Sequence, residues 1–359
     1  MTGGAPDGPF FIVGPPRSGT SLLTEALDAH PRLAVLPETW LFHLLWRLRS
    51  SRRFPSRRHA ILLLDQVWHY LRWSEPLGAR VVAAVALRAL DEPLAPREVV
   101  RAIGEEYARR RGATAWGEKT PVHALHEEEI AALLPGARFL RVVRDPRDVV
   151  VSWAEAWNGG VLDADSLVRA ASSVLRHLRA VLDGDRHEGR PGRLVRLEDL
   201  AAEPRRVLTG VCSFLGESFD DSLLRFHESD RTLRLSTVPA HVHLAKPFRP
   251  ELAGRHRDRL DAGTRALLDA AFRSEIERLG YVPGPAAAIP GRLRRALAEI
   301  ERRSRGPRPG ERCRAVSSRL RVAATYLPRS VAGRVLRHDV ARTAPEWRRR
   351  LDAGPARPG

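Results

Sequence analysis

A glycine-containing segment near the N-terminus limits this chain to few folds. Residues 10–13, Phe-Phe-Ile-Val, form an apolar run that predicts a buried strand. Residues 14–19, Gly-Pro-Pro-Arg-Ser-Gly, predict a tight loop, and the residues from Thr20 onward predict a helix with one apolar face. A strand, a glycine loop and a helix N-terminus together present backbone N–H groups to an anion. The segment therefore predicts a phosphate cradle, or else a strand–helix turn that needs glycine for backbone reasons alone.

The loop departs at one position from the nucleotide-triphosphate pattern G-x-x-x-x-G-K-[ST]. Gly14, Gly19 and Ser21 match that pattern, whereas Thr20 occupies the lysine position. The only cation of the loop is Arg17. Because the missing lysine normally contacts the β- and γ-phosphates, we expect this loop to hold a single phosphate-like group.

Further apolar segments alternate with helical patterns along the chain. Strands are predicted over 32–36, 115–119, 138–143 and 193–197. This alternation predicts an α/β fold, P-loop-like and three-layered, with a central and mainly parallel sheet. Ligands of such sheets bind at the carboxyl ends of the strands. The glycine loop, Glu38, Lys119 and Arg144 all lie at the carboxyl ends of predicted strands, so we expect them to meet at one edge.

The predicted domain covers residues 9–285 and contains a helical insert at about 40–112. Residues 286–359 form an Arg-rich helical extension after the Pro-Gly-Pro boundary. This extension carries 19 arginines against six acidic residues, and so holds most of the net charge of +17. No nucleic-acid partner is therefore expected for the main domain. The extension packs on the domain, contacts an acidic partner, or lies on an anionic membrane.

Composition narrows the remaining possibilities. Hydrophobic residues make up 43% of the chain, but no apolar run approaches the roughly 20 residues of a membrane span. Cys212 and Cys313 are too few and too far apart for a disulfide framework. The first residues lack the features of a signal peptide, so we expect a cytoplasmic protein. Of 60 basic residues only Lys119 and Lys246 are lysines, which marks two places where a compact ammonium is wanted, or else reflects chance.

Two motifs together resemble the sulfotransferases that use 3′-phosphoadenosine 5′-phosphosulfate. Residues 16–21, Pro-Arg-Ser-Gly-Thr-Ser, are similar to the loop that binds the 5′-phosphosulfate in that family. Residues 139–152 are similar to its 3′-phosphate motif, and residues 195–200 and 246–249 also fit. The resemblance covers residues 9–283 and is closest to the tyrosylprotein-like and bacterial branches.

The resemblance implies a set of site residues. Glu38 corresponds to the glutamate base of those branches, while His123 is the alternative base, displaced from the position that follows a Lys-Thr pair in the cytosolic branch. Lys119 and Lys246 are the expected catalytic cations. Contacts with the donor are expected from Arg17, Ser18, Gly19, Thr20, Ser21, Arg144, Ser152 and, more weakly, Ser236. Two departures are Leu197, which replaces a tyrosine of the family, and the missing arginine–glycine phosphate motif of the cytosolic branch.

The implied reaction is a metal-independent transfer of a sulfuryl group to a hydroxyl or amine of a small-molecule, carbohydrate or lipid acceptor. A small-molecule kinase with the same loop architecture is an alternative, which the absent loop lysine disfavours. A non-catalytic nucleotide-binding module is a second alternative. The acceptor and the oligomeric state do not follow from the sequence.

Overall fold

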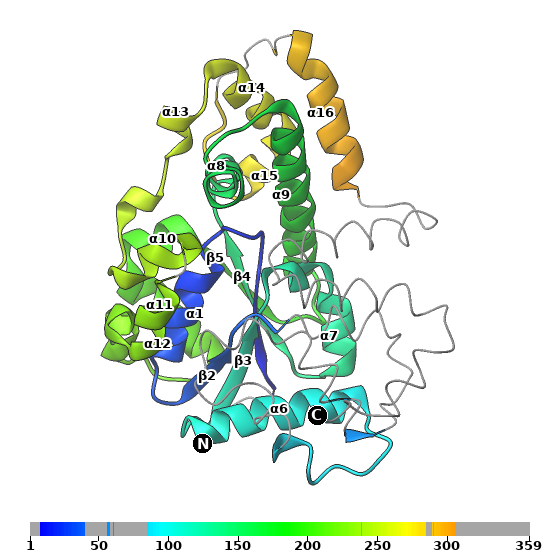
Figure 1. Cartoon of the computed structure of the whole chain (residues 1–359), viewed down its shortest axis with the longest axis vertical. Coiled ribbons are helices and arrows are strands. Elements are labelled where there is room, and N and C mark those ends of the chain that lie inside the picture. The colour runs from blue at the N-terminus through cyan, green and yellow to red at the C-terminus, as the bar shows by residue number, and fades with distance from the viewer. Residues whose placement is uncertain are drawn as a thin grey trace, which may run out of the picture.

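The computed structural model describes residues 8–39, 56–57, 60, 85–237, 239–284, 289 and 291–305. Five parallel strands form one sheet in the order β2-β3-β1-β4-β5, with helices on both faces (Figure 1). The predicted α/β fold with a central parallel sheet is thus confirmed. Most of the predicted insert, and everything beyond residue 305, lies outside the described residues.

The strands form where the sequence is apolar or β-branched. They are β1 (Phe10–Val13), β2 (Leu33–Leu36), β3 (Ala115–Lys119), β4 (Arg138–Val143) and β5 (Gly192–Arg196). β1 and β4 are buried along their whole length, as is typical of parallel strands covered on both faces.

One predicted strand end was wrong. The sequence predicted that the last strand reaches Leu197, but Leu197 is the first residue of α10 (Leu197–Ala202). Glu198 and Asp199 occupy the first turn of that helix, where carboxylates favour the positive end of the dipole, and this ends the strand one residue earlier.

Alternate side chains of each strand enter two separate apolar cores. One core lies under α1 (Thr20–Asp28), α10 and α11 (Pro204–Leu215). The other lies under α6 (Pro96–Arg110), α8 (Pro146–Trp157) and α9 (Ala164–Asp185). The helices that follow β1 and β4 therefore leave toward opposite faces. Their N-termini meet at the carboxyl edge of the sheet, which is where such folds bind ligands.

Two helical regions differ from expectation. The 22-residue helix α9 was not predicted. Residues 262–278 form two helices rather than one, α14 (Ala262–Ala271) and α15 (Arg273–Arg278), separated at the buried Phe272. The remaining short elements are η2 (Pro121–Leu125), α7 (Glu127–Leu133), η3 (Asp221–Glu228), α12 (Asp230–Leu235), η4 (Pro239–Ala245), η5 (Pro250–Leu252) and α13 (His256–Arg259). None of the helices in the described ranges is long and apolar enough to cross a membrane.

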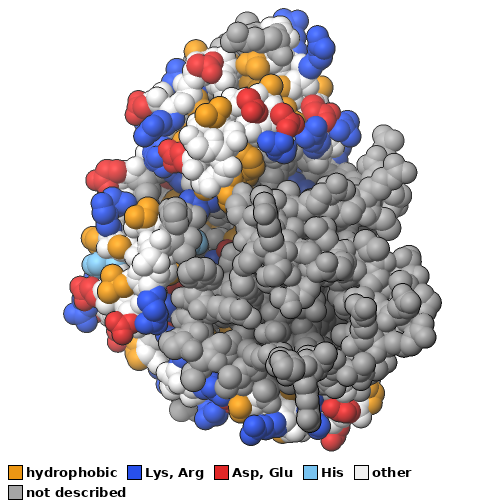
Figure 2. All heavy atoms as spheres, viewed as in Figure 1, with side chains coloured by type: hydrophobic (Ala, Val, Ile, Leu, Met, Phe, Trp, Pro, Cys, Tyr) orange, Lys and Arg blue, Asp and Glu red, His pale blue; other side chains and the backbone are white. Residues whose placement is uncertain are grey.

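The first helix of the C-terminal extension, α16 (Gly291–Ser304), packs against α9 and α14 (Figure 1). Leu293 and Leu297 pack against the core and Ile300 is fully buried in it. Burial of one such side chain stabilises the fold by about 1.5–3 kcal/mol. Arg179 on α9 adds contacts of 3.1 Å to Glu301 and 2.9 Å to Ser304. The apolar face of α16 is therefore occupied by the domain. Figure 2 shows both signs of charge intermixed over the described part of one face.

Candidate active site

The loop between β1 and α1 is shaped by two glycines that other residues would disrupt. A Cβ atom on Gly14 would lie 2.2 Å from the carbonyl oxygen of Val142. Gly19 has a φ of 100°, and a Cβ atom there would lie 2.6 Å from a methyl group of Leu197. Gly19 is also the N-cap of α1, and it has no side chain that could accept a hydrogen bond from the first N–H groups of the helix. The N-terminus of α1 is therefore open to an anion.

The side chains of the loop support this backbone. Ser18 is fully buried and its hydroxyl donates to the carbonyl oxygen of Val142 at 3.2 Å. The carbonyl of Thr20 accepts a hydrogen bond of 2.8 Å from Thr24. The hydroxyl of Ser18 is thus used by the fold, and its backbone N–H donates to the carbonyl oxygen of Pro15 at 3.1 Å. This leaves backbone N–H groups as the means by which Gly19 and Thr20 could hold a ligand, and the contact predicted for Ser18 stays a prediction.

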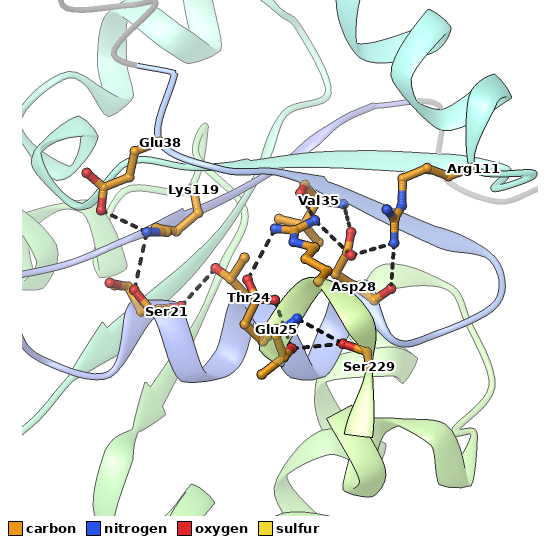
Figure 3. Close-up of polar contacts among 12 residues, drawn as sticks. Ser21, Thr24, Glu25, Asp28, Val35, Glu38, Arg111, Lys119 and Ser229 are labelled. Atoms are coloured by element: carbon orange, nitrogen blue, oxygen red, sulfur yellow. Dashed lines mark hydrogen bonds and ion pairs between the residues drawn. The ribbon is translucent and has the colours of Figure 1, made fainter. Parts of the chain in front are cut away.

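A carboxylate, an ammonium and a hydroxyl meet beside the start of α1 (Figure 3). The Nζ of Lys119 lies 2.8 Å from Oε1 of Glu38 and 3.3 Å from Oγ of Ser21. Lys119 comes from the end of β3, Glu38 follows β2, and Ser21 is in the first turn of α1. The side chain of Lys119 is 6% exposed, whereas that of Glu38 is 25% exposed. Glu38 can therefore be reached by a substrate while its ion pair with Lys119 persists.

The turn between β4 and α8 lies next to the glycine loop. Nε of Arg17 donates to Oγ of Ser152 on α8 at 3.2 Å, so the two motifs touch. Arg144 is buried at the end of β4, with its guanidinium 3.7 Å from Asp148. Burial, and then the charge of Arg144, lower the pKa of Arg17. Burial also lowers the pKa of Arg144. Burial is the largest cause of both shifts, and two buried cations that lie close together suit a site that binds an anion.

Arg147, only three residues further on, has a different environment. Its guanidinium contacts Asp145 at 2.6 Å and Asp269 at 2.7 Å. Although burial opposes the shift, hydrogen bonds and charge from these carboxylates raise the pKa of Arg147. Arg147 is thus compensated inside the fold, as a salt-bridge residue rather than a ligand residue.

The model of a family described as "Sulfotransferase family" matches residues 9–221, which is more than half of the chain. The chain belongs to the sulfotransferase family. The match contains the glycine loop, Glu38, Lys119 and the turn with Arg144, so the residues that converge in the structure lie inside the region typical of the family.

Similar proteins agree with this assignment. The sulfotransferase is 24% identical over 283 residues to "Protein-tyrosine sulfotransferase A" of Caenorhabditis elegans, covering 77% of this chain and 68% of that protein. It is 26% identical over 150 residues to "Nodulation protein NoeE" of Sinorhizobium fredii, covering 41% of this chain but only 31% of that protein. The fold is similar to that of the sulfotransferase domain from the curacin biosynthetic pathway, with a TM-score of 0.53 at 19% identity over 77% of this chain and 99% of that domain.

Two predicted site residues of this sulfotransferase lie apart from the contacts above. Lys246 follows η4 and its side chain is exposed. Ser236 ends α12, and its hydroxyl donates to the carbonyl oxygen of Leu233 at 2.7 Å. The roles of both residues stay predictions. The structure brings together the other predicted residues: Glu38, Lys119, Arg17, Ser18, Gly19, Thr20, Ser21, Arg144 and Ser152.

The alternative base, His123, is fully buried. Its Nδ1 lies 3.0 Å from Oε2 of Glu118, which points away from Lys119. Glu38, in contrast, is partly exposed and contacts Lys119. The choice of Glu38 over His123 as the base stays a prediction.

The sequence analysis did not identify two histidines on η4, His241 and His243. Burial, and then the charges of Lys119 and Arg17, lower the pKa of His241 to about 3. Burial, followed by the charges of Arg17 and Arg249, lowers the pKa of His243 to about 4. Both imidazoles are therefore neutral at pH 7 and face the cations of the site. Nδ1 of His241 is buried with no hydrogen-bond partner among the described residues.

Arg255 was also missed. Burial is the largest cause of the lowered pKa of Arg144, and the charge of Arg255 lowers it further. Arg255 therefore belongs to the same cationic cluster. Asp148 holds the backbone N–H groups of Gly254 and His256 at 2.7 Å, which fixes this segment against α8.

The segment that precedes η4 is anchored by a buried charge network (Figure 3). Arg231 on α12 contacts Glu25 at 3.2 Å and Asp28 at 2.7 Å, both on α1. Thr232 adds a hydrogen bond of 3.0 Å to Glu25. Because breaking a buried ion pair costs about 3–5 kcal/mol, this network holds α12 firmly on α1. It therefore fixes the start of the segment that carries the two histidines.

Among the residues that the structure describes, no group of three His, Cys, Asp or Glu side chains is arranged to hold a metal ion. The expectation of a metal-independent reaction stays a prediction. One observation in particular supports a fit between the described residues and the donor expected from the family. The open N-terminus of α1 lies beside arginines whose pKa values are lowered by burial and by neighbouring cations.

Proposed function

We propose that this sulfotransferase transfers a sulfuryl group from 3′-phosphoadenosine 5′-phosphosulfate to a hydroxyl or amine of a small-molecule, carbohydrate or lipid acceptor. The observation that carries the proposal is the contact of Lys119 with both Glu38 and Ser21. It joins a carboxylate that can accept a proton to a cation and to the start of an anion-binding helix. A phenolic hydroxyl belongs in the same acceptor class, because the name of the nematode relative specifies protein tyrosine for that protein.

The proposed binding roles follow from the positions of the side chains. Backbone N–H groups of residues 19–21 at the start of α1 would hold the 5′-phosphate end of the donor, with Ser18 beside them in the loop. Arg144 and Ser152 would hold its 3′-phosphate, since guanidinium groups bind phosphate through paired hydrogen bonds. Lys246 and Ser236 are proposed to contact the donor from the chain around η4.

The proposed chemistry assigns each residue one task. The bound donor supplies the activated sulfuryl group. Glu38 accepts the proton that leaves the acceptor hydroxyl, as a general base that typically contributes 10²–10⁴-fold to the rate. Lys119 is placed to stabilise negative charge near the first turn of α1. Its ion pair with Glu38 also keeps the carboxylate oriented before the acceptor binds.

The decisive experiment separates donor binding from transfer. Titration calorimetry should show that adenosine 3′,5′-bisphosphate binds the chain and that ATP with Mg²⁺ binds far more weakly. Incubation with sulfate-labelled donor and pools of phenols, sugars and lipid alcohols should then give a labelled product. Preference for ATP with Mg²⁺ would instead support the kinase alternative, and binding without any transfer would support the non-catalytic module.

Substitution of Glu38 tests the assigned base. Glu38→Gln keeps the size of the side chain but removes its ability to accept a proton. We expect kcat to fall by about 10²–10⁴-fold with the affinity for adenosine 3′,5′-bisphosphate unchanged within twofold. His123→Gln is the competing variant, and a larger loss of kcat in that variant at equal melting temperature would assign the base to His123.

A further inference from the structure

β3 presents two neighbouring charged side chains to opposite sides of the sheet. In the register of the sheet, Lys119 lies beside Ile12 and Glu118 lies beside Phe11, and those two residues enter different cores. Lys119 consequently points toward Ser21 on α1. Glu118 points into the opposite core, where it is 2% exposed. The proposed catalytic cation and a buried carboxylate are thus adjacent in sequence and back to back in space.

The carboxylate of Glu118 is surrounded by polar groups from three segments. Its Oε1 accepts from the backbone N–H of Thr39 at 3.1 Å, the hydroxyl of Thr39 at 2.7 Å and the hydroxyl of Thr120 at 2.5 Å. Its Oε2 lies 3.0 Å from Nδ1 of His123. Thr39, Thr120 and His123 are all fully buried. Although burial opposes the shift, His123 and the two threonines lower the pKa of Glu118, so the buried carboxylate is kept ionised.

These contacts fix the residue that follows Glu38. The N–H group that Glu118 binds belongs to the peptide unit between Glu38 and Thr39, so the backbone of the proposed base is held directly. On the other side of the sheet, the carboxylate of Glu38 is held by Lys119. Glu118 therefore holds Thr39 on one face of the sheet, and Lys119 holds Glu38 on the other face. A segment without regular secondary structure needs such contacts to keep a defined position.

We propose that Glu118, with Thr39, Thr120 and His123, is a positioning cluster that sets Glu38 against Lys119 for proton transfer. The proposal rests on the proposed sulfuryl transfer. It assigns His123 a definite role other than that of a base, because its ring orients the carboxylate of Glu118. A cluster that served stability alone would need no hydrogen bond to the peptide unit of the base.

The test uses an isosteric pair at Thr39 in the full chain. Thr39→Val keeps the shape of the side chain and removes the hydroxyl, while Thr39→Ser keeps the hydroxyl. We expect kcat to fall about tenfold or more in Thr39→Val, since small misplacements of a catalytic group can cost up to about 10²-fold. The KM for the donor and the affinity for adenosine 3′,5′-bisphosphate should stay within twofold, and Thr39→Ser should restore kcat to within twofold.

Ser172→Ala is the matched control. Ser172 is also buried, and its hydroxyl donates to the carbonyl oxygen of Val168 inside α9 rather than to Glu118. Its melting temperature should fall by a similar amount to that of Thr39→Val, with no change of kcat. If Thr39→Val does not fold, the pair Thr120→Val and Thr120→Ser gives the same test, because that hydroxyl reaches the same oxygen.

The outcomes separate this proposal from the proposed function. If the unmodified chain transfers sulfate and Thr39→Val retains its kcat, the positioning role is wrong and the transfer function stands. A parallel fall of kcat and nucleotide affinity, which Thr39→Ser does not reverse, would also overturn the positioning role and indicate general loss of structure. If the unmodified chain binds the nucleotide but transfers nothing, the proposed function itself fails.

Discussion

Two turns join a buried strand to a helix: the loop of residues 14–19 between β1 and α1, called here the first corner, and the turn of residues 144–145 between β4 and α8, called the second corner. The two corners differ in how the N-terminus of the helix is compensated. At the first corner, Gly19 caps α1, and no acidic side chain lies in the first turn of this fully described helix. At the second corner, Asp145 caps α8 and accepts from the N–H of Arg147 at 3.0 Å, and Asp148 lies in the first turn. One helix N-terminus is thus left for an external anion, while the other is already satisfied by the chain's own carboxylates.

This difference explains why the second corner needs arginines. Because the dipole of α8 is compensated by Asp145 and Asp148, a phosphate there must be bound by side-chain cations such as Arg144. The first corner can use backbone N–H groups, so the absent loop lysine leaves it functional. One corner offers backbone N–H groups and the other offers side-chain cations. Two such anion sites side by side suit a ligand that carries two separate phosphate groups.

The largest expected effect comes from closing the first corner. Gly19→Ala would place a methyl group 2.6 Å from Leu197 and force a positive φ on an alanine. Because the backbone must then move, the N–H groups at the start of α1 lose their alignment. We expect the affinity for adenosine 3′,5′-bisphosphate to fall at least about 100-fold, since hydrogen bonds to a charged group contribute about 1.5–3 kcal/mol each. Titration calorimetry measures the change.

Gly112→Ala is the matched control for that variant. Gly112 also has a positive φ, of 66°, but a Cβ atom there would have no neighbour within 4 Å in the described structure. Gly112→Ala should lower the unfolding free energy by about 1–2 kcal/mol, because alanine disfavours a positive φ, and it should leave the nucleotide affinity unchanged. If Gly19→Ala and Gly112→Ala lose nucleotide affinity equally, the first corner is not part of the donor site.

A smaller effect should distinguish the two arginines of the second corner. Arg144→Ala removes a buried cation of the proposed phosphate site. Its ion pair with Asp148 is long, at 3.7 Å, and Asp148 keeps its contacts with His256, so we expect nucleotide affinity to fall about 10- to 100-fold with a smaller change in melting temperature than in Arg147→Ala. Arg147→Ala breaks a buried pair with Asp145 and Asp269, so we expect a loss of about 3–5 kcal/mol in unfolding free energy and nearly unchanged affinity. Calorimetry and urea unfolding of both variants measure the two quantities. The reverse assignment of these effects would contradict the comparison of the corners.

The sequence predicted the sheet and the residues at its carboxyl edge because both depend on local patterns. The apolar runs of β1 and β4 and the glycine loop can be recognised without knowledge of neighbours. Helix α9 has apolar residues at helical spacing, among them Leu167, Ala171 and Leu178, so periodicity could have identified it. That omission has no physical cause.

Other parts of the site depend on contacts between distant residues. The bonds between Thr39 and Glu118 join positions 79 residues apart, and Arg17 reaches Ser152 across 135 residues. His241 and Arg255 lie in segments of short 3-10 and α-helices, where no periodic pattern marks a buried face. The rarity of lysine in the chain pointed to Lys119, which contacts Glu38 in the structure. The same argument pointed to Lys246, whose side chain is exposed and whose role stays a prediction.

The smallest expected effect concerns acid stability and tests whether burial and the cations beside the first corner, Lys119 and Arg17, keep His241 neutral. His241 has a pKa of about 3 in the folded chain because of burial and the charges of Lys119 and Arg17. An unfolded histidine titrates near 6.5, so between about pH 6.5 and 3 the unfolded state binds more protons than the folded state. Stability must therefore fall as the pH falls through that window, by at most about 1.4 kcal/mol per pH unit for one such group.

His241→Gln removes that contribution while it keeps a polar side chain. We expect the unfolding free energy, measured in urea between pH 7 and 4.5, to decline less steeply in the variant than in the unmodified chain. His187→Gln, at an exposed position, is the control and should leave the slope unchanged. Addition of adenosine 3′,5′-bisphosphate should also flatten the slope of the unmodified chain, because phosphate oxygens near Arg17 and Lys119 offset the charges that keep His241 neutral. An unchanged slope in His241→Gln would mean that the cations of the first corner do not act on this imidazole, and the electrostatic contrast between the two corners would then rest on Arg144 and Arg147 alone.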